Sequence, residues 1–201
     1  MLCLVTDRRR LRPGAATFGA AMRALLDQAA WAAGAGIDLL QVREPDLETA
    51  PLAELVTALV AGVAGSGTRV VVNDRTDVAL ACRAHGVHLR HDSVPSDAAR
   101  RIVPPGFLIG RSVHSTAQAR AAGPVDYLIA GTVFASRSKA GNAPLLGIDG
   151  LAEIVQAVSV PVLAIGGMTP ARLDEIAAAG AAGAAGIGLF IDWFDRLETP
   201  S

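Results

Sequence analysis

The sequence predicts an α/β protein in which eight parallel strands alternate with eight helices. Three observations lead to this prediction. Short apolar runs alternate with Ala- and Leu-rich amphipathic stretches along the whole chain, and the runs show no regular change between polar and apolar residues. Half of the residues, 51%, are hydrophobic, but only 4% are aromatic. Uninterrupted apolar runs of roughly 4–7 residues are typical of strands that helices cover on both faces.

The expected strands are rich in leucine and β-branched residues, which suit a pleated, buried surface. In chain order they are residues 2–6, 37–43, 69–73, 86–89, 107–110, 126–130, 160–165 and 183–189. The expected helices, which lie between and after them, are residues 18–33, 52–63, 77–84, 96–102, 116–122, 150–157, 170–179 and 192–197. Ser115 and Thr169 offer capping oxygens before two of these helices, and Gly123 and Gly180 suit the left-handed residue that ends a helix.

Strict alternation of strand and helix implies a parallel sheet. Eight units in 201 residues average about 25 residues each, and small closed barrels reach down to about 200 residues. We therefore expect a compact (β/α)8, or TIM, barrel. An open doubly wound sheet is the alternative, but no GxGxxG follows the first strand. Residues 1–201 are expected to form a single domain, because no linker or low-complexity segment divides them.

Composition excludes several classes of partner. The formal net charge of −1 creates no field that would favour nucleic acid or an anionic membrane. The longest uncharged stretch, residues 176–191, is shorter than the roughly 18 residues that a membrane span needs. Cys3 and Cys82 lack metal-type spacing and read as reduced thiols. We expect a soluble, cytoplasmic protein with no signal peptide.

Polar residues gather where the expected strands end. In a parallel barrel the carboxyl ends of the strands carry the catalytic groups, whereas the opposite ends serve stability. Any one of these residues could simply cap a strand, but six of the eight strand ends carry such residues. The candidates are Gln41, Arg43, Asn73, Asp74, Asp92, Ser112, His114 and Thr132. His88, inside the fourth strand, is predicted to be structural.

Glycines after the seventh and within the eighth expected strand suggest a phosphate site. Gly166 and Gly167 join a strand to a helix start, where free backbone N–H groups stabilise an anion. Gly188 lies on the neighbouring expected strand, and loops after strands seven and eight commonly bind phosphate in such barrels. Tight turns alone would also explain these glycines.

The stretch 131–147 is long for a loop in a compact domain, and such loops are usually functional or disordered. Ser136, Ser138 and Lys139 would supply hydroxyl and ammonium donors to a phosphate. A solvated loop without a binding role is the alternative.

Seven segments in order carry a family resemblance. They are Leu4-Val5-Thr6-Asp7, Gln41-Val42-Arg43-Glu44, Val72-Asn73-Asp74-Arg75, Gly86-Val87-His88-Leu89, Gly110-Arg111-Ser112-Val113-His114-Ser115, Asp126-Tyr127 and Ala164-Ile165-Gly166-Gly167-Met168-Thr169-Pro170. With them the chain resembles the thiamine phosphate synthase and thiazole tautomerase superfamily from end to end. The resemblance implies a barrel, often a homodimer, that acts in thiamine biosynthesis.

The synthases of this superfamily join hydroxymethylpyrimidine diphosphate to a thiazole phosphate and release pyrophosphate with Mg²⁺. The resemblance assigns diphosphate contacts to several residues, namely Gln41, Arg43, Asn73, Ser112, Ser136, Ser138 and Lys139. It gives Asp74 the role of a metal ligand, with Asp92 as a further candidate, and Gly166 a contact with the thiazole phosphate. In the tautomerases, which need no metal, the histidine matching His114 moves a proton within thiazole phosphate carboxylate.

Three positions depart from the synthase pattern. Pro45 replaces an expected lysine, Ser93 replaces the second metal carboxylate, and Gly188 replaces a serine that contacts phosphate. The first two changes weaken the magnesium–diphosphate part of the site and leave the thiazole-phosphate part. The sequence thus slightly favours a tautomerase with His114 as acid and base, because imidazole suits proton transfer at neutral pH. A synthase is the alternative, and a barrel that binds thiazole or thiamine phosphates without catalysis is the third hypothesis.

Overall fold

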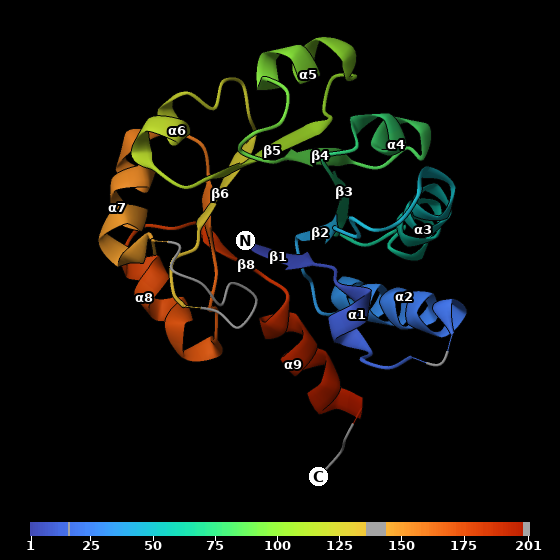
Figure 1. Cartoon of the computed structure of the whole chain (residues 1–201). Coiled ribbons are helices and arrows are strands. Elements are labelled where there is room, and N and C mark those ends of the chain that lie inside the picture. The colour runs from blue at the N-terminus through green and yellow to red at the C-terminus, as the bar shows by residue number, and fades with distance from the viewer. Residues whose placement is uncertain (16, 136–143, 199–201) are drawn as a thin grey trace. The chain divides into compact units, whose positions relative to one another are not determined.

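Strands and helices alternate along the whole chain, as the sequence predicts. The computed structural model describes residues 1–15, 17–135 and 144–198. Its strands are hydrogen-bonded in the order β1-β2-β3-β4-β5-β6-β7-β8 as a closed barrel (Figure 1). The predicted (β/α)8 barrel is therefore confirmed, and the open doubly wound sheet is excluded.

The strands are short and almost entirely buried. They are β1 (Leu2–Val5), β2 (Leu39–Val42), β3 (Arg69–Asn73), β4 (Gly86–Leu89), β5 (Leu108–Val113), β6 (Tyr127–Gly131), β7 (Val162–Ile165) and β8 (Gly183–Gly186). The helices are α1 (Arg8–Leu11), α2 (Phe18–Gly34), α3 (Thr49–Gly62), α4 (Thr76–Ala81), α5 (Ser96–Ile102), α6 (Thr116–Arg120), α7 (Gly147–Ala157), α8 (Leu173–Ala178) and α9 (Gly188–Glu198), with a 3-10 turn η2 (Pro170–Arg172) before α8.

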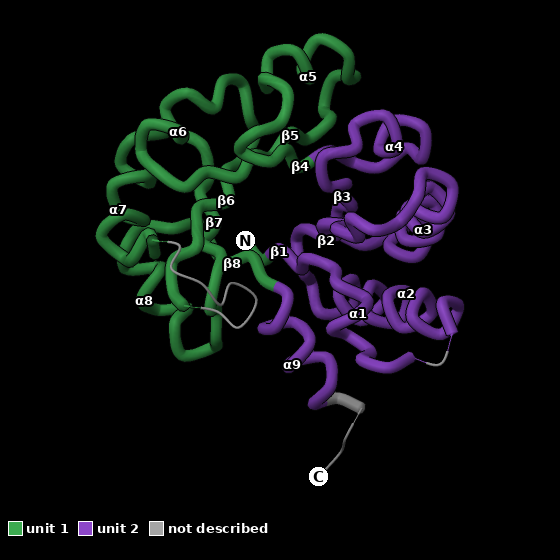
Figure 2. Tube along the Cα trace, in the orientation of Figure 1, with its two compact units in different colours: residues 1–2, 88–186 green, residues 3–87, 187–201 purple. Residues whose placement is uncertain are grey.

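The chain divides into two compact units (Figure 2). Unit 1 comprises residues 1–2 and 88–186, and unit 2 comprises residues 3–87 and 187–201. The prediction of one domain over residues 1–201 stays a prediction.

In unit 2, strands β1, β2 and β3 pair in parallel. Leu4 aligns with Leu40, and Leu40 aligns in turn with Val70. These three side chains are almost completely buried, so apolar residues occupy matching heights on neighbouring strands. The register also sets Gln41 beside Val71, two residues before the polar end of β3.

In unit 1, strands β5 to β8 pair in parallel with small residues at their centre. Ala130 aligns with Ala164, and Ala164 aligns with Ala184. All three residues are fully buried. The same register sets Ser112 beside Ile129 and Gly131 beside Ile165, so the polar end of β5 and the glycine end of β6 follow directly from the strand pairing.

Two element boundaries differ from the sequence prediction in ways that affect the site. β5 continues to Val113, three residues beyond the predicted end, so Ser112 belongs to the strand and not to the loop. β8 ends at Gly186, and Gly188 is the first residue of α9, so the prediction that Gly188 lies on the eighth strand is wrong. In the apolar run 183–191, only residues 183–185 pair with β7, and the run continues into a helix from Gly188.

Helix α1 was not anticipated, because a four-residue helix is too short to show a periodic apolar pattern. Asp7 caps it by accepting a hydrogen bond from the Arg10 backbone N–H at 3.1 Å. Within the described residues, no helix has the length and apolar character needed to cross a lipid bilayer.

Candidate active site

Two amide side chains meet at the carboxyl ends of β2 and β3 in unit 2. Gln41 Nε2 donates a hydrogen bond to Asn73 Oδ1 at 3.0 Å. Gln41 Oε1 is buried and has no hydrogen-bond partner among the described residues. Leaving a buried acceptor unsatisfied costs about 1–3 kcal/mol, so Gln41 Oε1 is an atom that a bound ligand or its hydration water would satisfy. The structure thus brings these two predicted site residues together.

In the segment after β2, the consecutive side chains of Arg43 and Glu44 differ in exposure. The Arg43 backbone N–H donates to Thr6 Oγ1 at 2.9 Å, and the Arg43 side chain is exposed. Glu44 is buried instead and binds Arg8 through Oε1 to the backbone N–H, at 3.1 Å, and through Oε2 to Nη1, at 2.7 Å. Burial raises the pKa of Glu44, although the Arg8 hydrogen bonds oppose that effect. Glu44 therefore fixes the segment to α1 and leaves Arg43 available at the surface.

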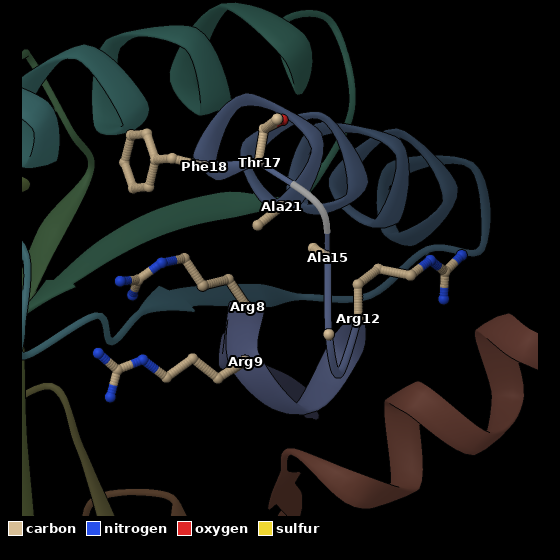
Figure 3. Close-up of a pocket in the computed structure, with 8 residues that line it drawn as sticks. Arg8, Arg9, Arg12, Ala15, Thr17, Phe18 and Ala21 are labelled. Atoms are coloured by element: carbon tan, nitrogen blue, oxygen red, sulfur yellow. The ribbon is translucent and has the colours of Figure 1, made fainter.

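Arg8 is also the centre of an ion-pair cluster with Asp46. Its Nη1 lies 2.7 Å from Asp46 Oδ1, and Arg9 binds the same carboxylate at 2.7 Å. Hydrogen bonding to Arg8 lowers the pKa of Asp46 to about 2. A pocket of about 220 Å³ adjoins these arginines, but Figure 3 shows that Arg8 and Arg9 extend to one side of α1 and Arg12 to the other. Since each of the three guanidinium groups contacts a carboxylate, the pocket is not an anion site.

Asp74 follows β3 directly and has a left-handed backbone, with φ of +61°. Aspartate tolerates this conformation better than most residues. Its half-buried carboxylate is a hard oxygen ligand of the type that magnesium takes, and magnesium often keeps waters and substrate phosphates for the rest of its shell. Among the described residues, no three His, Cys, Asp or Glu side chains cluster as a metal site. The donors present in unit 2 fit a magnesium ion that substrate oxygens help to hold.

The second metal candidate, Asp92 in unit 1, is exposed and engaged with a cation. Its Oδ2 lies 2.6 Å from Arg90 Nη2, and its Oδ1 lies 3.8 Å from His91 Nδ1. A metal-binding role for Asp92 stays a prediction that requires its carboxylate to leave Arg90.

A buried polar row lies in unit 1 across β4, β5 and β6. His88 Nε2 lies 2.8 Å from Ser112 Oγ, and His88 Nδ1 lies 3.2 Å from the Tyr127 hydroxyl. His88 is 1% exposed and Tyr127 is 2% exposed. Burial lowers the pKa of His88 to about 3, and the nearby Arg111 charge acts in the same direction. His88 is therefore a neutral ring that must have one donor and one acceptor nitrogen.

A missing side chain at Gly110 makes room for this row. A Cβ at position 110 would lie 2.1–2.5 Å from three atoms of the Tyr127 ring and hydroxyl. Gly110 lies two residues before Ser112 on β5 and beside Tyr127 in the register. Because Gly110 has no side chain, the Tyr127 ring can pack against β5 close to Ser112.

We expect Gly110→Ala to lower the free energy of unfolding by about 1–3 kcal/mol, because an added methyl group in a packed core forces neighbours to move. Urea unfolding at pH 7.5 measures the change. Gly62→Ala is the matched control, since a Cβ at that position meets nothing within 4 Å. Equal effects of the two substitutions would show that Tyr127 does not need the space at Gly110.

His114 follows β5 and is exposed. Its Nδ1 makes a short contact with the Gly131 carbonyl oxygen, and its ring packs edge-on against His91 with centroids 4.9 Å apart. A carbonyl oxygen can only accept, so Nδ1 carries the proton of that bond. Nε2 of a neutral His114 ring is then free of its proton and has the electronic form of a base.

The glycine pair after β7 packs tightly against the segment after β6. Gly166 has φ of +103°, and a Cβ there would lie 2.3 Å from Thr132 Cγ2. The Phe134 backbone N–H donates to the Gly166 carbonyl at 3.2 Å. Arg172 donates to the Gly167 carbonyl and lies 4.2 Å from the centroid of the Phe134 ring. Thr132, Gly166 and Gly167, three of the predicted site residues, are therefore neighbours.

The helix after this loop differs from the prediction. Thr169 makes no side-chain capping bond, and the chain forms a 3-10 turn before the six-residue helix α8. A phosphate-binding role for this loop stays a prediction, and it would depend on the backbone of Gly166 and Gly167 and not on a long helix.

Gly188, the third phosphate candidate, lies in unit 2. A Cβ at this position would lie 3.3 Å from Arg10 Nη2. The absence of a side chain at position 188 therefore lets a guanidinium group approach the first turn of α9.

One side chain that sequence reasoning missed organises the segment around Asp92. Arg111 donates to the backbone carbonyls of His91, Ser93 and Val94 at 2.9–3.3 Å. It also donates to Ser96 Oγ at 3.2 Å. The available sequence signal was a charged residue, Arg111, between Gly110 and Ser112 at the end of an apolar run. The predicted roles of Ser136, Ser138 and Lys139 concern residues that lie outside the described part of the chain.

Comparisons with known proteins agree on one family. A family profile described as thiamine monophosphate synthase matches residues 2–190. A protein of Methanoculleus marisnigri named thiamine-phosphate synthase is 44% identical over 167 residues, which cover 82% of this chain and 79% of the relative. A thiamine-phosphate synthase of Roseiflexus castenholzii is 37% identical over 190 residues, which cover 94% of this chain and 79% of the relative.

Solved structures give the same result. Thiamine phosphate pyrophosphorylase from Pyrococcus furiosus superposes with a TM-score of 0.80 at 31% sequence identity and covers 98% of this chain and 93% of its own. Dihydrodipicolinate synthase from Aquifex aeolicus, at 13% identity and a TM-score of 0.59, shares the fold alone. The relatives are named for the synthase, so they favour the alternative hypothesis and correct the preference for a tautomerase.

Proposed function

The chain belongs to the thiamine monophosphate synthase family, an enzyme family, and we propose that it is itself a thiamine-phosphate synthase. It would couple hydroxymethylpyrimidine diphosphate to a thiazole phosphate. The observation that carries this proposal is the hydrogen-bonded pair of Gln41 and Asn73 followed directly by Asp74. Amide donors and a carboxylate at the ends of β2 and β3 suit a diphosphate and its counterion, which a tautomerase does not use.

The proposed reaction breaks the bond between the pyrimidine methylene carbon and the diphosphate oxygen. Pyrophosphate leaves with the bonding electrons, and the lone pair of the thiazole nitrogen forms the new carbon–nitrogen bond. The rate depends on stabilising negative charge as it grows on the leaving group. Arg43, with its exposed guanidinium, and Lys139 are proposed to supply positive charge, and Gln41, Asn73 and the hydroxyl of Ser112 to supply hydrogen bonds.

Two further serines, Ser136 and Ser138, are proposed to contact the same substrate, as the family resemblance implies. Magnesium, when bound, would neutralise part of the diphosphate charge. Asp74 would hold it, with Asp92 as the second candidate. Gln41 Oε1, the unsatisfied acceptor, is suited to accept a hydrogen bond from a water or a substrate donor at this place.

The thiazole phosphate is proposed to bind the glycine loop of unit 1. Gly166 and Gly167 have left-handed backbones and no side chains, so an anion can reach their N–H groups. Thr132 packs against Gly166 and is proposed to limit how deeply the phosphate enters. Gly188 in unit 2 remains a proposed phosphate contact, through the backbone at the start of α9.

A thiazole tautomerase is the second candidate, on one observation. The contact of His114 Nδ1 with the Gly131 carbonyl leaves Nε2 as the basic nitrogen of the ring. A base of this form could remove and return a proton on thiazole phosphate carboxylate without any metal.

A side-by-side assay tests the proposal. We expect the purified protein to release pyrophosphate when it is given hydroxymethylpyrimidine diphosphate, thiazole phosphate and Mg²⁺, and to lose this activity in EDTA. With thiazole phosphate carboxylate alone we expect no isomerisation. Isomerisation that continues in EDTA and disappears in His114→Ala would establish the tautomerase in its place.

The Asp74→Asn substitution should reduce kcat/KM of the synthase reaction by about 100-fold at 1 mM Mg²⁺ (an order-of-magnitude expectation for a lost charge on a metal ligand). Asparagine keeps the tolerance for a left-handed backbone, so the fold should persist. Part of the loss should return as the Mg²⁺ concentration rises. Asp97→Asn, which removes an exposed partner of Arg101, is the control and should leave kcat/KM unchanged. Full activity of Asp74→Asn would remove Asp74 from the metal site.

A further inference from the structure

We infer that His88 and Tyr127 are positioning residues that turn the hydroxyl proton of Ser112 toward the substrate. The inference rests on the proposed function, in which Ser112 binds the diphosphate. It is carried by the buried row in unit 1, where His88 Nε2 contacts Ser112 Oγ at 2.8 Å and His88 Nδ1 contacts the Tyr127 hydroxyl at 3.2 Å.

Only two proton arrangements satisfy this row. In the first, the Tyr127 hydroxyl donates to His88 Nδ1, and Nε2–H donates to Ser112 Oγ. In the second, Nδ1–H donates to the Tyr127 oxygen, and the Ser112 hydroxyl donates to Nε2. A third possibility, a doubly protonated ring, is excluded at neutral pH because burial keeps His88 uncharged.

The chemistry of the two hydroxyl groups favours the first arrangement. A phenol is more acidic than an alkyl alcohol, with a pKa near 10, so it is the better donor and the poorer acceptor. Tyr127 therefore donates and Ser112 accepts.

The two arrangements differ in what Ser112 offers to a ligand. In the first, Ser112 Oγ accepts from His88, and its own O–H proton remains to be donated. In the second, that proton is used up inside the protein. Diphosphate oxygens carry no protons to donate at neutral pH, so only the first arrangement gives a hydrogen bond between Ser112 and the substrate.

The packing holds the row in place. Tyr127 is buried and lies against Gly110, where a Cβ would collide with its ring. The His88 and Tyr127 rings are tilted by 32° with centroids 5.6 Å apart. Ser112 is half-buried near the carboxyl end of β5, and its hydroxyl contacts His88.

Nitrogen NMR of the unaltered protein tests the proton arrangement directly. We expect the ¹⁵N shifts of His88 at pH 7.5 to report a neutral ring protonated at Nε2. A ring protonated at Nδ1 would overturn the inference, whatever activity the protein has.

Binding of inorganic pyrophosphate in the presence of Mg²⁺, measured by calorimetry, tests the consequence without any turnover. We expect His88→Leu to weaken pyrophosphate binding by about 10-fold, and His88→Gln, which retains an N–H donor of similar reach, to recover most of that loss. In a Ser112→Ala background, His88→Leu should have no further effect. A loss of the same size with and without the Ser112 hydroxyl would overturn the inference.

The two proposals fail in different ways. If the protein binds pyrophosphate with the expected dependence on Ser112 but does not form thiamine phosphate, the proposed synthase activity fails and the positioning role stands. If the synthase reaction proceeds but Ser112→Ala binds pyrophosphate normally, the positioning role fails. Should His88→Leu not fold, the NMR measurement on the unaltered chain still decides between the two proton arrangements.

Discussion

Replacing Arg8 by alanine should lower the free energy of unfolding by about 3–5 kcal/mol, which is the usual effect of removing one partner of a buried ion pair. The Arg8 side chain is 9% exposed, and that of Glu44 is 2% exposed. Without the Arg8 side chain, the Glu44 carboxylate would keep the backbone N–H donor at position 8 but would lose the cation that pairs with it in the interior. Urea unfolding followed by circular dichroism at pH 7.5 measures the difference.

Arg9→Ala is the matched control for Arg8→Ala. Arg9 lies next to Arg8 on α1 and contacts the same carboxylate of Asp46, but its side chain is 72% exposed. Exposed ion pairs contribute less than about 1 kcal/mol, so Arg9→Ala should unfold close to the wild-type urea concentration. Similar losses from the two substitutions would show that burial of Glu44 does not set the stability of this segment.

The double substitution Arg8→Met with Glu44→Leu separates the charge from the packing. Removing both partners of a buried pair is often neutral or stabilising, because no unpaired charge remains in the interior. We expect the double variant to be more stable than Arg8→Ala. Its activity should nevertheless fall. Arg43 directly precedes Glu44, so its position depends on the contact by which Glu44 holds this segment to α1.

The sequence predicts the strands well where an apolar run ends at a polar residue. The limits of β3 and β4 were predicted as they occur, because Asn73 and the charged residue after Leu89 stop the pattern. The eighth strand was predicted three residues too long, since glycine, alanine and leucine fit a buried strand and a helix start equally well. Periodicity alone cannot separate these cases.

The site was predicted to different depths in the two units. In unit 2, Gln41, Asn73 and Asp74 follow from the rule that strand ends carry polar groups. In unit 1, Ser112 was found by the same rule, but its support by His88 and Tyr127 was not. A contact between β4, β5 and β6 depends on strand register and on the empty space at Gly110, and neither can be read from local sequence.

The stability of the protein should fall steeply as pH decreases from about 6.5 toward 3. Burial, with a smaller effect from the Arg111 charge, lowers the pKa of His88 from 6.5 to about 3. Within that range the unfolded chain takes up a proton that the folded protein does not, so folding loses about 1.4 kcal/mol per pH unit from this residue alone. The contribution of His88 is fully present above pH 6.5, and about 3 kcal/mol of it should be gone at pH 4.

Other groups shape the curve and must be separated from His88. His85, whose pKa is lowered by burial and by Arg69, acts in the same direction. Glu44, whose pKa is raised by burial, acts in the opposite direction, and Asp46 adds a further loss only below about pH 4. Urea unfolding at pH 7.5, 6, 5 and 4.5 should therefore be repeated with His88→Gln. The slope of the free energy of unfolding against pH should fall in this variant by an amount that corresponds to close to one proton.

The ring of His88 provides an independent measurement of the same effect. Its ¹⁵N shifts should stay those of a neutral ring from pH 7.5 down to pH 4.5, while an exposed histidine titrates near pH 6.5. A His88 ring that gains its proton near pH 6 would mean that water reaches the row between β4 and β6. In that state the ring would donate from both nitrogens, and Tyr127 could no longer donate to it. The contribution of His88 to the pH dependence of stability would then be largely lost.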